Sequence, residues 1–140
     1  MSNSGSEEPQ RTYLITGANQ GLGFDAARQL AVLPETRKVY LACRTESKAA
    51  AAIEKLVTDH GISREKLDFV LFEASDGKES IAGKLSLPKD ERFDSILFNA
   101  GGMGNDPSGK PTPPNQVLDM YQMNLLGHIH LLDCLLYTSD

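Results

Sequence analysis

The chain has 140 residues, 40% of them hydrophobic, and a formal net charge of -5 at pH 7. This size and composition fit one domain with one hydrophobic core. No Lys/Arg-rich run is present, which argues against nucleic-acid binding, and no apolar stretch approaches the ~20 residues that span a bilayer. Cys43 and Cys134 lie far apart without a partner motif, so we expect no metal site and no disulfide scaffold. Such cysteine usage favours a reducing compartment, and we expect a cytoplasmic protein.

The expected secondary structure alternates between strands and helices. Residues 1–11 are polar and acidic, without an apolar signal segment, and we expect a disordered tail. Short apolar runs predict strands at 12–16, 37–43, 67–72 and 93–98. Apolar residues at helical spacing predict helices over 26–33, 49–57, 81–85 and 117–132, with an irregular Gly/Pro-rich loop at 101–114. The first helix should begin within a residue or two of Gly21, and Gly61 stands where the second should stop.

This alternation predicts an α/β fold. The strands are near-continuous apolar runs, which is typical of strands buried on both faces of a parallel sheet. Right-handed crossovers between such strands produce a doubly wound sheet. We expect the spatial order third, second, first, fourth.

A glycine-rich turn follows the first expected strand. Gly17, Gly21 and Gly23 stand between that strand and the first helix, where glycines let the main chain approach a pyrophosphate. The helix amino terminus then presents free N–H groups to the anion. The spacing differs from Gly-x-Gly-x-x-Gly, and an ordinary strand-to-helix loop is the alternative.

Arg44 stands where the second strand ends. An acidic residue there would hold the ribose hydroxyls of NAD, whereas a guanidinium fork matches the 2′-phosphate of NADP. A solvated arginine without a ligand is the alternative. The arginine favours NADP over NAD.

Three motifs in order resemble the short-chain dehydrogenase/reductase family. They are Thr16-Gly-Ala-Asn-Gln-Gly-Leu-Gly23, Phe98-Asn-Ala-Gly101 and Met123-Asn-Leu-Leu-Gly-His128. The segment Val39 to Arg44 also resembles the retinol-dehydrogenase and protochlorophyllide-reductase branches. The resemblance implies a Rossmann-type NAD(P)-binding domain over 12–133, of which only the first four strands are present.

The resemblance also implies the residues that bind the cofactor. They are Gly17, Asn19, Gln20, Gly21, Leu22, Gly23, Arg44, Glu73, Asn99, Ala100 and Gly101. Two positions depart from the family. Glu73 stands where the family has an Asp that contacts the adenine amine, and Phe98 replaces an Asn. Asn99 has the alternative of a turn residue bonded to its own backbone.

Asn124 matches the Asn of the family's catalytic tetrad. It lies on the expected apolar stripe of the last helix, where a buried amide without partners costs ~1–3 kcal/mol, so we expect it to be buried and hydrogen-bonded. Packing alone would be the alternative role. His60, His128 and His130 are interpreted as structural residues, because the last two are two apart on a helix and point in different directions.

The remaining tetrad residues are a Ser, a Tyr and a Lys four residues after the Tyr. None of Tyr13, Tyr40 and Tyr121 is followed by Lys at that spacing, and for Tyr137 the position lies beyond the sequence. Residues 134–140 resemble translated sequencing-adapter DNA, and we interpret them as an artefact. We therefore expect an N-terminal fragment that is itself inactive.

The leading hypothesis is an NADP-dependent oxidoreductase that moves a hydride between nicotinamide and a carbonyl or alcohol substrate. The alternative is a non-catalytic dinucleotide-binding sensor or scaffold. A P-loop or flavodoxin-like domain is disfavoured, because no Gly-Lys-Ser/Thr turn follows the first strand. The expected partner is a small-molecule substrate, and an oligomer is compatible with the sequence.

Overall fold

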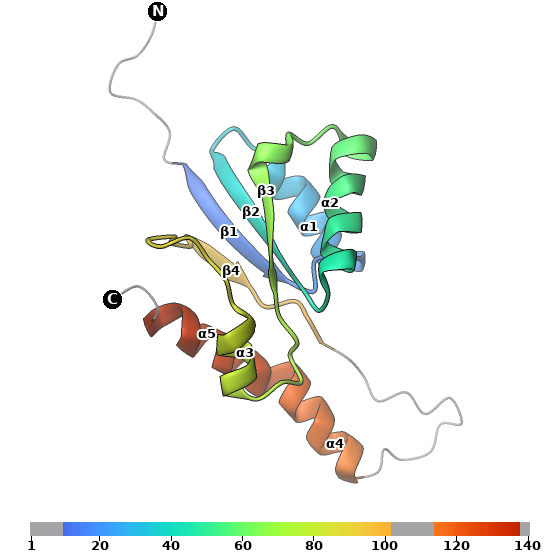
Figure 1. Cartoon of the computed structure of the whole chain (residues 1–140). Helices are drawn as coiled ribbons and strands as arrows, with labels where there is room; N and C mark the ends of the chain where they lie inside the picture. The colour runs from blue at the N-terminus through green and yellow to red at the C-terminus, as the bar shows by residue number, and fades with distance from the viewer. Residues whose placement is uncertain (1–9, 102–113, 138–140) are drawn as a thin grey trace, which may run out of the picture.

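The computed structural model describes residues 10–101 and 114–137. The expected tail up to residue 9, most of the loop at 101–114 and residues 138–140 lie outside this description. Four parallel strands form one sheet in the order β3-β2-β1-β4, which confirms the expected order (Figure 1). The strands are β1 (Arg11–Thr16), β2 (Thr36–Cys43), β3 (Leu67–Leu71) and β4 (Ser95–Leu97).

Helices cover both faces of the sheet, as a doubly wound fold requires (Figure 1). One face carries α1 (Gly21–Ala31) and α2 (Glu46–His60), followed by the short 3₁₀ turn η1 (Arg64–Lys66). The other carries α3 (Lys78–Lys84) and a long helix made of α4 (Pro114–Tyr121), the π-helical turn η2 (Gln122–Leu126) and α5 (Gly127–Tyr137). Within the described ranges, no helix combines the length and apolarity needed to cross a membrane.

Local hydrogen bonds explain why α2 begins and ends where it does. The Thr45 hydroxyl accepts a hydrogen bond from the Lys48 amide at 3.2 Å and caps the helix start. Gly61 adopts a left-handed conformation, φ 67°, and its amide donates to the carbonyls of Leu56 and Val57. The predicted stop at Gly61 is thus confirmed.

Each strand differs from its expected bounds by one residue or more, and the first and fourth are the informative cases. Arg11, assigned to the tail, is the first residue of β1. β4 is shorter than 93–98, because Asp94 pairs with Thr12 through its side chain as well as its backbone: the Thr12 amide donates to the Asp94 carboxylate at 2.7 Å. Phe98 lies beyond the ladder and is 42% exposed.

The expected stripe of the last helix is only partly buried. His128 and Leu131 are buried against the sheet, whereas Val117 and Tyr121 are half exposed. The helical period identified an apolar face correctly, but the sheet covers only the α5 end of it.

Tyr40 is the largest fully buried side chain and anchors the amino-terminal half of the sheet. Its hydroxyl donates to the Glu91 carboxylate at 2.6 Å, and its ring meets Phe93 edge-on at 5.4 Å between centroids. Arg37 pairs with the same carboxylate. Burial, and then the Glu91 carboxylate, raise the pKa of the Tyr40 hydroxyl, so it stays protonated as a donor.

We expect Tyr40→Phe to lower the free energy of unfolding by ~1 kcal/mol, because the Glu91 carboxylate loses a donor while the ring still fills its site. Tyr13→Phe is the control, because the Tyr13 hydroxyl makes no hydrogen bond within the part of the chain that the structure describes. Urea unfolding measures both. Equal stability of Tyr40→Phe and the parent would contradict the assignment of Tyr40 as an anchor.

Candidate dinucleotide-binding site

A cleft of about 450 Å³ lies at the carboxyl ends of the strands. The strand order reverses between β1 and β4, and ligands of open α/β sheets bind at such a switch point. The lining residues come from the turn after β1, the ends of β2 and β3, the segment after β4 and η2. They are Gly17, Asn19, Gln20, Gly21, Ala42, Cys43, Arg44, Phe72, Glu73, Ala74, Ser75, Asn99, Ala100, Gly101 and Met123.

The three turn glycines meet different requirements. Gly17 has φ 65°, and a Cβ on it would lie 2.9 Å from Ala100 Cα. Gly23 has ordinary dihedral angles, but its Cβ would lie 2.5 Å from the Gly17 carbonyl oxygen. Gly21 has φ 61° with open space around it. Gly17 and Gly23 therefore permit close backbone packing, whereas Gly21 supplies a backbone conformation.

The amino terminus of α1 opens toward this turn. Gln20 occupies the N-cap position in an extended conformation and makes no side-chain capping bond, and the first turn holds no acidic residue. The first N–H groups of a helix need partners from outside the helix. An anion at this end would accept from them and interact favourably with the helix dipole.

The Thr16 hydroxyl fixes the segment after β4 against this turn. Its oxygen accepts hydrogen bonds from the amides of Asn99 and Ala100, both at 2.9 Å. The Asn99 side-chain amide donates to the carbonyls of Thr16 at 3.2 Å and Gly17 at 3.3 Å. The Asn99 side chain therefore bonds to β1 and its turn, which disfavours the alternative of a turn residue bonded to its own backbone.

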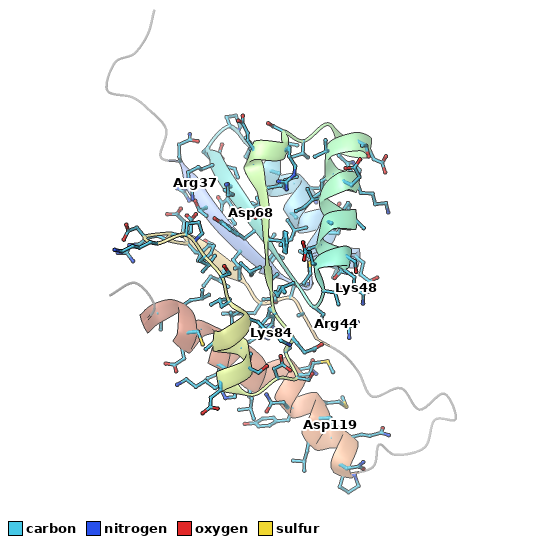
Figure 2. The ribbon with its side chains drawn as sticks, viewed as in Figure 1. Arg37, Arg44, Lys48, Asp68, Lys84 and Asp119 are labelled. Atoms are coloured by element: carbon cyan, nitrogen blue, oxygen red, sulfur yellow. The ribbon has the colours of Figure 1, made fainter. Side chains whose placement is uncertain are left out.

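Arg44 lies at the rim with a 61% exposed side chain, and its Nε is 3.9 Å from a Glu73 carboxylate oxygen. Figure 2 shows Arg44 and Lys48 at the same edge, where β2 ends and α2 begins. A pair this exposed contributes little to stability. Arg44 is therefore accessible to a ligand, with Glu73 as the competing anion.

The cleft collects most of the residues predicted to bind the cofactor. Two are exceptions. Leu22 points to solvent with 83% exposure, and Gly23 is buried against Gly17. Gly23 acts on the cleft through packing, whereas Leu22 could contribute its backbone alone.

Asn124 corrects a prediction. Its side chain is exposed rather than buried, so the cost of an unsatisfied buried amide does not apply. It lies in η2, and its Oδ1 would be 2.7 Å from a Cβ on Gly101, which places it beside the mouth of the cleft. The helical period could not show that this turn is π-helical, a geometry frequent at functional sites.

Sequence reasoning missed several residues of the site. Ser75 and Met123 line the cleft, and the Thr16 hydroxyl holds the segment that forms its floor. Met123 precedes Asn124 in its motif, which is a usable signal. Thr16 begins the glycine motif, but the motif does not reveal its hydrogen bonds, because its partners are more than 80 positions away in sequence.

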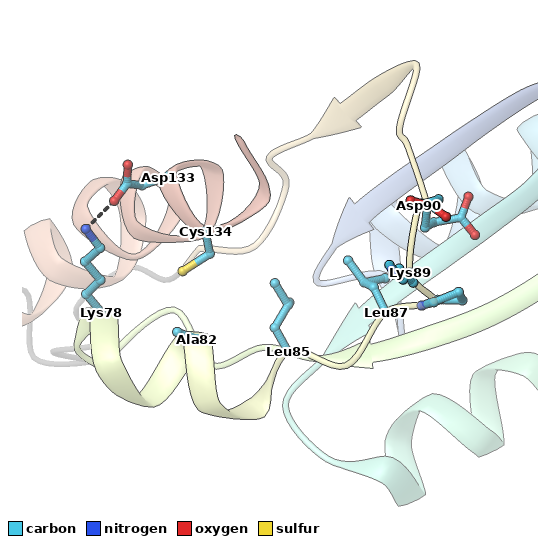
Figure 3. Close-up of a pocket in the computed structure, with 10 residues that line it drawn as sticks. Lys78, Ala82, Leu85, Leu87, Lys89, Asp90, Asp133 and Cys134 are labelled. Carbon is cyan, nitrogen blue, oxygen red and sulfur yellow. Dashed lines mark ion pairs between the residues drawn. The ribbon is translucent and has the colours of Figure 1, made fainter. Parts of the chain in front are cut away.

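A second cavity of about 600 Å³ lies between α3, the segment before β4 and α5 (Figure 3). Leu85 and Leu87 form its apolar wall, and Lys78 pairs with Asp133 at its edge. It shares no lining residue with the cleft. No glycine turn stands among its lining residues, so the smaller cleft is the better dinucleotide site.

Two alanine substitutions separate the roles of the glycines. Gly21→Ala should cost ~1–2 kcal/mol of stability, from the left-handed conformation alone. Gly17→Ala should cost ~2–5 kcal/mol, because overpacking against Ala100 adds ~1–3 kcal/mol to the cost of the left-handed conformation. Denaturant unfolding of the two variants measures the difference. Identical losses would show that the Gly17–Ala100 approach is not tightly packed.

Comparisons with known proteins agree with this geometry. The family model for short chain dehydrogenase matches residues 11–138. A short chain dehydrogenase/reductase of Colletotrichum higginsianum is 34% identical over 128 residues, which are 90% of this chain and 31% of that protein.

Solved structures share the fold at lower identity. A gluconate 5-dehydrogenase from Burkholderia cenocepacia in complex with NADP and tartrate superposes with a TM-score of 0.69 at 22% identity, over 91% of this chain and 48% of that one. An NADPH-bound carbonyl reductase from chicken fatty liver gives 0.67 at 22% identity, over 91% and 51%. The chain thus spans about a third of the length of the curated relative and about half of these structures.

Proposed function

Because the chain belongs to the short-chain dehydrogenase family, we propose that it is the nucleotide-binding part of an NADP-dependent oxidoreductase. The reaction is hydride transfer between nicotinamide and a carbonyl or alcohol carbon, and the substrate class is small or lipophilic carbonyl compounds. The observation that carries the proposal is the cleft in which the glycine turn and the exposed Arg44 lie at one sheet edge.

The residues of the cleft suit each part of the cofactor. The pyrophosphate would lie over Gly17 to Gly21, where the uncapped start of α1 supplies N–H donors. Glu73 can accept a hydrogen bond from the adenine amine. Asn99 to Gly101 form the floor, held by the Thr16 hydroxyl. The bound cofactor would supply the hydride chemistry.

Arg44 supports NADP rather than NAD. Its guanidinium cannot accept bonds from ribose hydroxyls, but it can donate two parallel bonds to a 2′-phosphate. Two proteins that share the fold, the gluconate 5-dehydrogenase and the carbonyl reductase, were solved with NADP and NADPH respectively. The segment Val39 to Arg44 supports a place near the retinol-dehydrogenase and protochlorophyllide-reductase branches.

Asn124 is the one tetrad residue that we assign within these residues. It stands beside Gly101 at the cleft mouth, where it could orient a substrate or water near the nicotinamide. Its Tyr and Lys partners have no counterpart at family spacing in the 140 residues. The alternative, a cofactor-binding sensor or scaffold, needs the cleft but no such pair.

Arg44→Asp tests the cofactor preference. It should weaken NADP binding roughly ten- to a hundredfold, since a charge-assisted contact to phosphate contributes ~1.5–3 kcal/mol, and it should favour NAD relatively. Arg92→Asp is the matched control. Arg92 is exposed and lies outside the cleft, and its substitution by Asp changes the net charge by the same amount. Calorimetric titration with both cofactors gives the ratio. Equal affinities of the parent for NADP and NAD would overturn the preference.

The second test separates binding from catalysis. The 140-residue chain should bind NADPH but oxidise it no faster than background with a panel of aldehydes and ketones, since it holds no Tyr–Lys pair for proton transfer. It should also associate in size-exclusion chromatography, because Leu97 and Phe98 at the β4 edge are exposed. Turnover in a monomeric peak would show that the catalytic residues are misassigned.

A further inference from the structure

The buried ring of His128 connects the long helix to the floor of the cleft. His128 is 7% exposed, and its Nε2 lies 2.9 Å from the Thr16 hydroxyl oxygen. The rings of Phe72 and Phe98 pack around it, at 5.5 and 5.1 Å between centroids. The helix that bears Asn124 is thereby joined to the same hydroxyl that holds Asn99 and Ala100.

The hydrogen bonds at Thr16 determine the tautomer of this histidine. A hydroxyl has two lone pairs and one proton, and both lone pairs already accept from the amides of Asn99 and Ala100. The hydroxyl proton must therefore be donated to His128, so Nε2 is unprotonated and Nδ1 carries the proton. Nδ1 faces the backbone carbonyl of Asn124 at 3.5 Å, which suits a donor.

We propose that neutral His128 is a positioning residue that latches the helix to the cleft floor through Thr16, and that protonation of its Nε2 opens this latch and weakens cofactor binding. A proton on Nε2 would face a hydroxyl whose lone pairs are both in use. Thr16 would then have to release Asn99 or Ala100, or the helix would have to move away. Either change disturbs the floor formed by Asn99 to Gly101. The cofactor part of this inference rests on the proposed function.

The surroundings of the ring favour its neutral form. Burial lowers the pKa of His128 below 6.5, and the Asn124 carbonyl only partly offsets this effect. The sequence neighbours of Thr16 and Phe98 are uncharged. Next to Phe72, Glu73 pairs with Arg44. The helix itself also bears His130, and Asp133, which pairs with Lys78.

The sign of the effect follows from the lowered pKa. Below pH 6.5 the unfolded chain takes up the proton more readily than the folded chain. The contribution of the latch to stability is therefore complete above this pH and decreases as the pH falls below it. Cofactor affinity should follow the same direction, if bound nucleotide requires the closed latch.

The first experiment determines the tautomer without any cofactor. Long-range ¹H–¹⁵N spectra of the imidazole at neutral pH distinguish a proton on Nδ1 from one on Nε2. We expect Nδ1–H for His128, and exposed His60 provides a reference signal in the same spectra. A proton on Nε2 of His128 at neutral pH would overturn the proposal.

The second experiment follows NADPH affinity and unfolding from about pH 7.5 to about pH 5.5 in the parent and in His128→Gln, His128→Phe and His60→Gln. Glutamine can still accept from Thr16 but does not titrate, whereas phenylalanine keeps the ring without an acceptor. The 2′-phosphate of NADPH titrates near pH ~6 in every variant, so only differences between variants count.

We expect the parent to lose about two- to tenfold more affinity on acidification than His128→Gln. Tenfold is the limit for one proton over the single pH unit between about 6.5 and about 5.5, where the effect lies. His128→Phe should bind more weakly at every pH, and His60→Gln should behave as the parent. Parental pH dependence in His128→Gln would refute the latch. If no variant binds NADPH, the proposed function fails, and the spectra and the pH dependence of unfolding still decide whether the latch exists.

Discussion

One hydroxyl group joins the three parts of this structure that must meet at the cleft. The Thr16 side chain ends β1, accepts hydrogen bonds from the two amides that follow β4, and is hydrogen-bonded to His128 on α5. The sheet brings β1 and β4 side by side, and this hydroxyl, together with the Asn99 side-chain amide, fixes the segment after β4 close to Gly17. The glycine turn, the cleft floor and the helix with Asn124 thus depend on a single buried polar centre, and such centres are costly to leave partly satisfied.

The two faces of the sheet are attached differently. On one face, α1 and α2 pack through a continuous apolar cluster, and the turn, Arg44 and the start of α1 belong to this unit. On the other face, the long helix packs on a second apolar cluster through Leu131 and Cys134. Near the cleft it is attached by the His128 bond, by Gln122 to the Asp76 carbonyl at 3.1 Å, and by the close approach of Gly127 to Ala74. A segment held by a few polar contacts can open locally at lower cost than a packed core. The turn and Arg44, which we propose to bind the nucleotide, belong to the face packed by α1 and α2. The position of Asn124 depends on the contacts of the long helix.

The sequence was sufficient for what local backbone chemistry and chirality determine. The strand order, the helix start at Gly21 and the stop at Gly61 follow from such rules. The Thr16 centre could not be predicted, because its partners are 83 to 112 positions away and a threonine at a strand end carries no distinguishing pattern. The burial of Asn124 was predicted wrongly, because an apolar period shows that a helix has a face but not where the sheet stops covering it. The 3.9 Å pairing of Arg44 with Glu73 likewise needed the alignment of two strand ends.

We propose that the nucleotide with a 2′-phosphate binds in this cleft rather than in the larger cavity beside α3. Chemical-shift mapping of the ¹⁵N-labelled chain with adenosine 2′,5′-bisphosphate, set against adenosine 5′-monophosphate, tests it most directly. We expect both ligands to shift the amide resonances around Gly17 and Gly21. The bisphosphate should also shift the Arg44 amide resonance strongly and bind more tightly. Shifts centred on Leu85 and Leu87, or no difference between the two ligands, would contradict it.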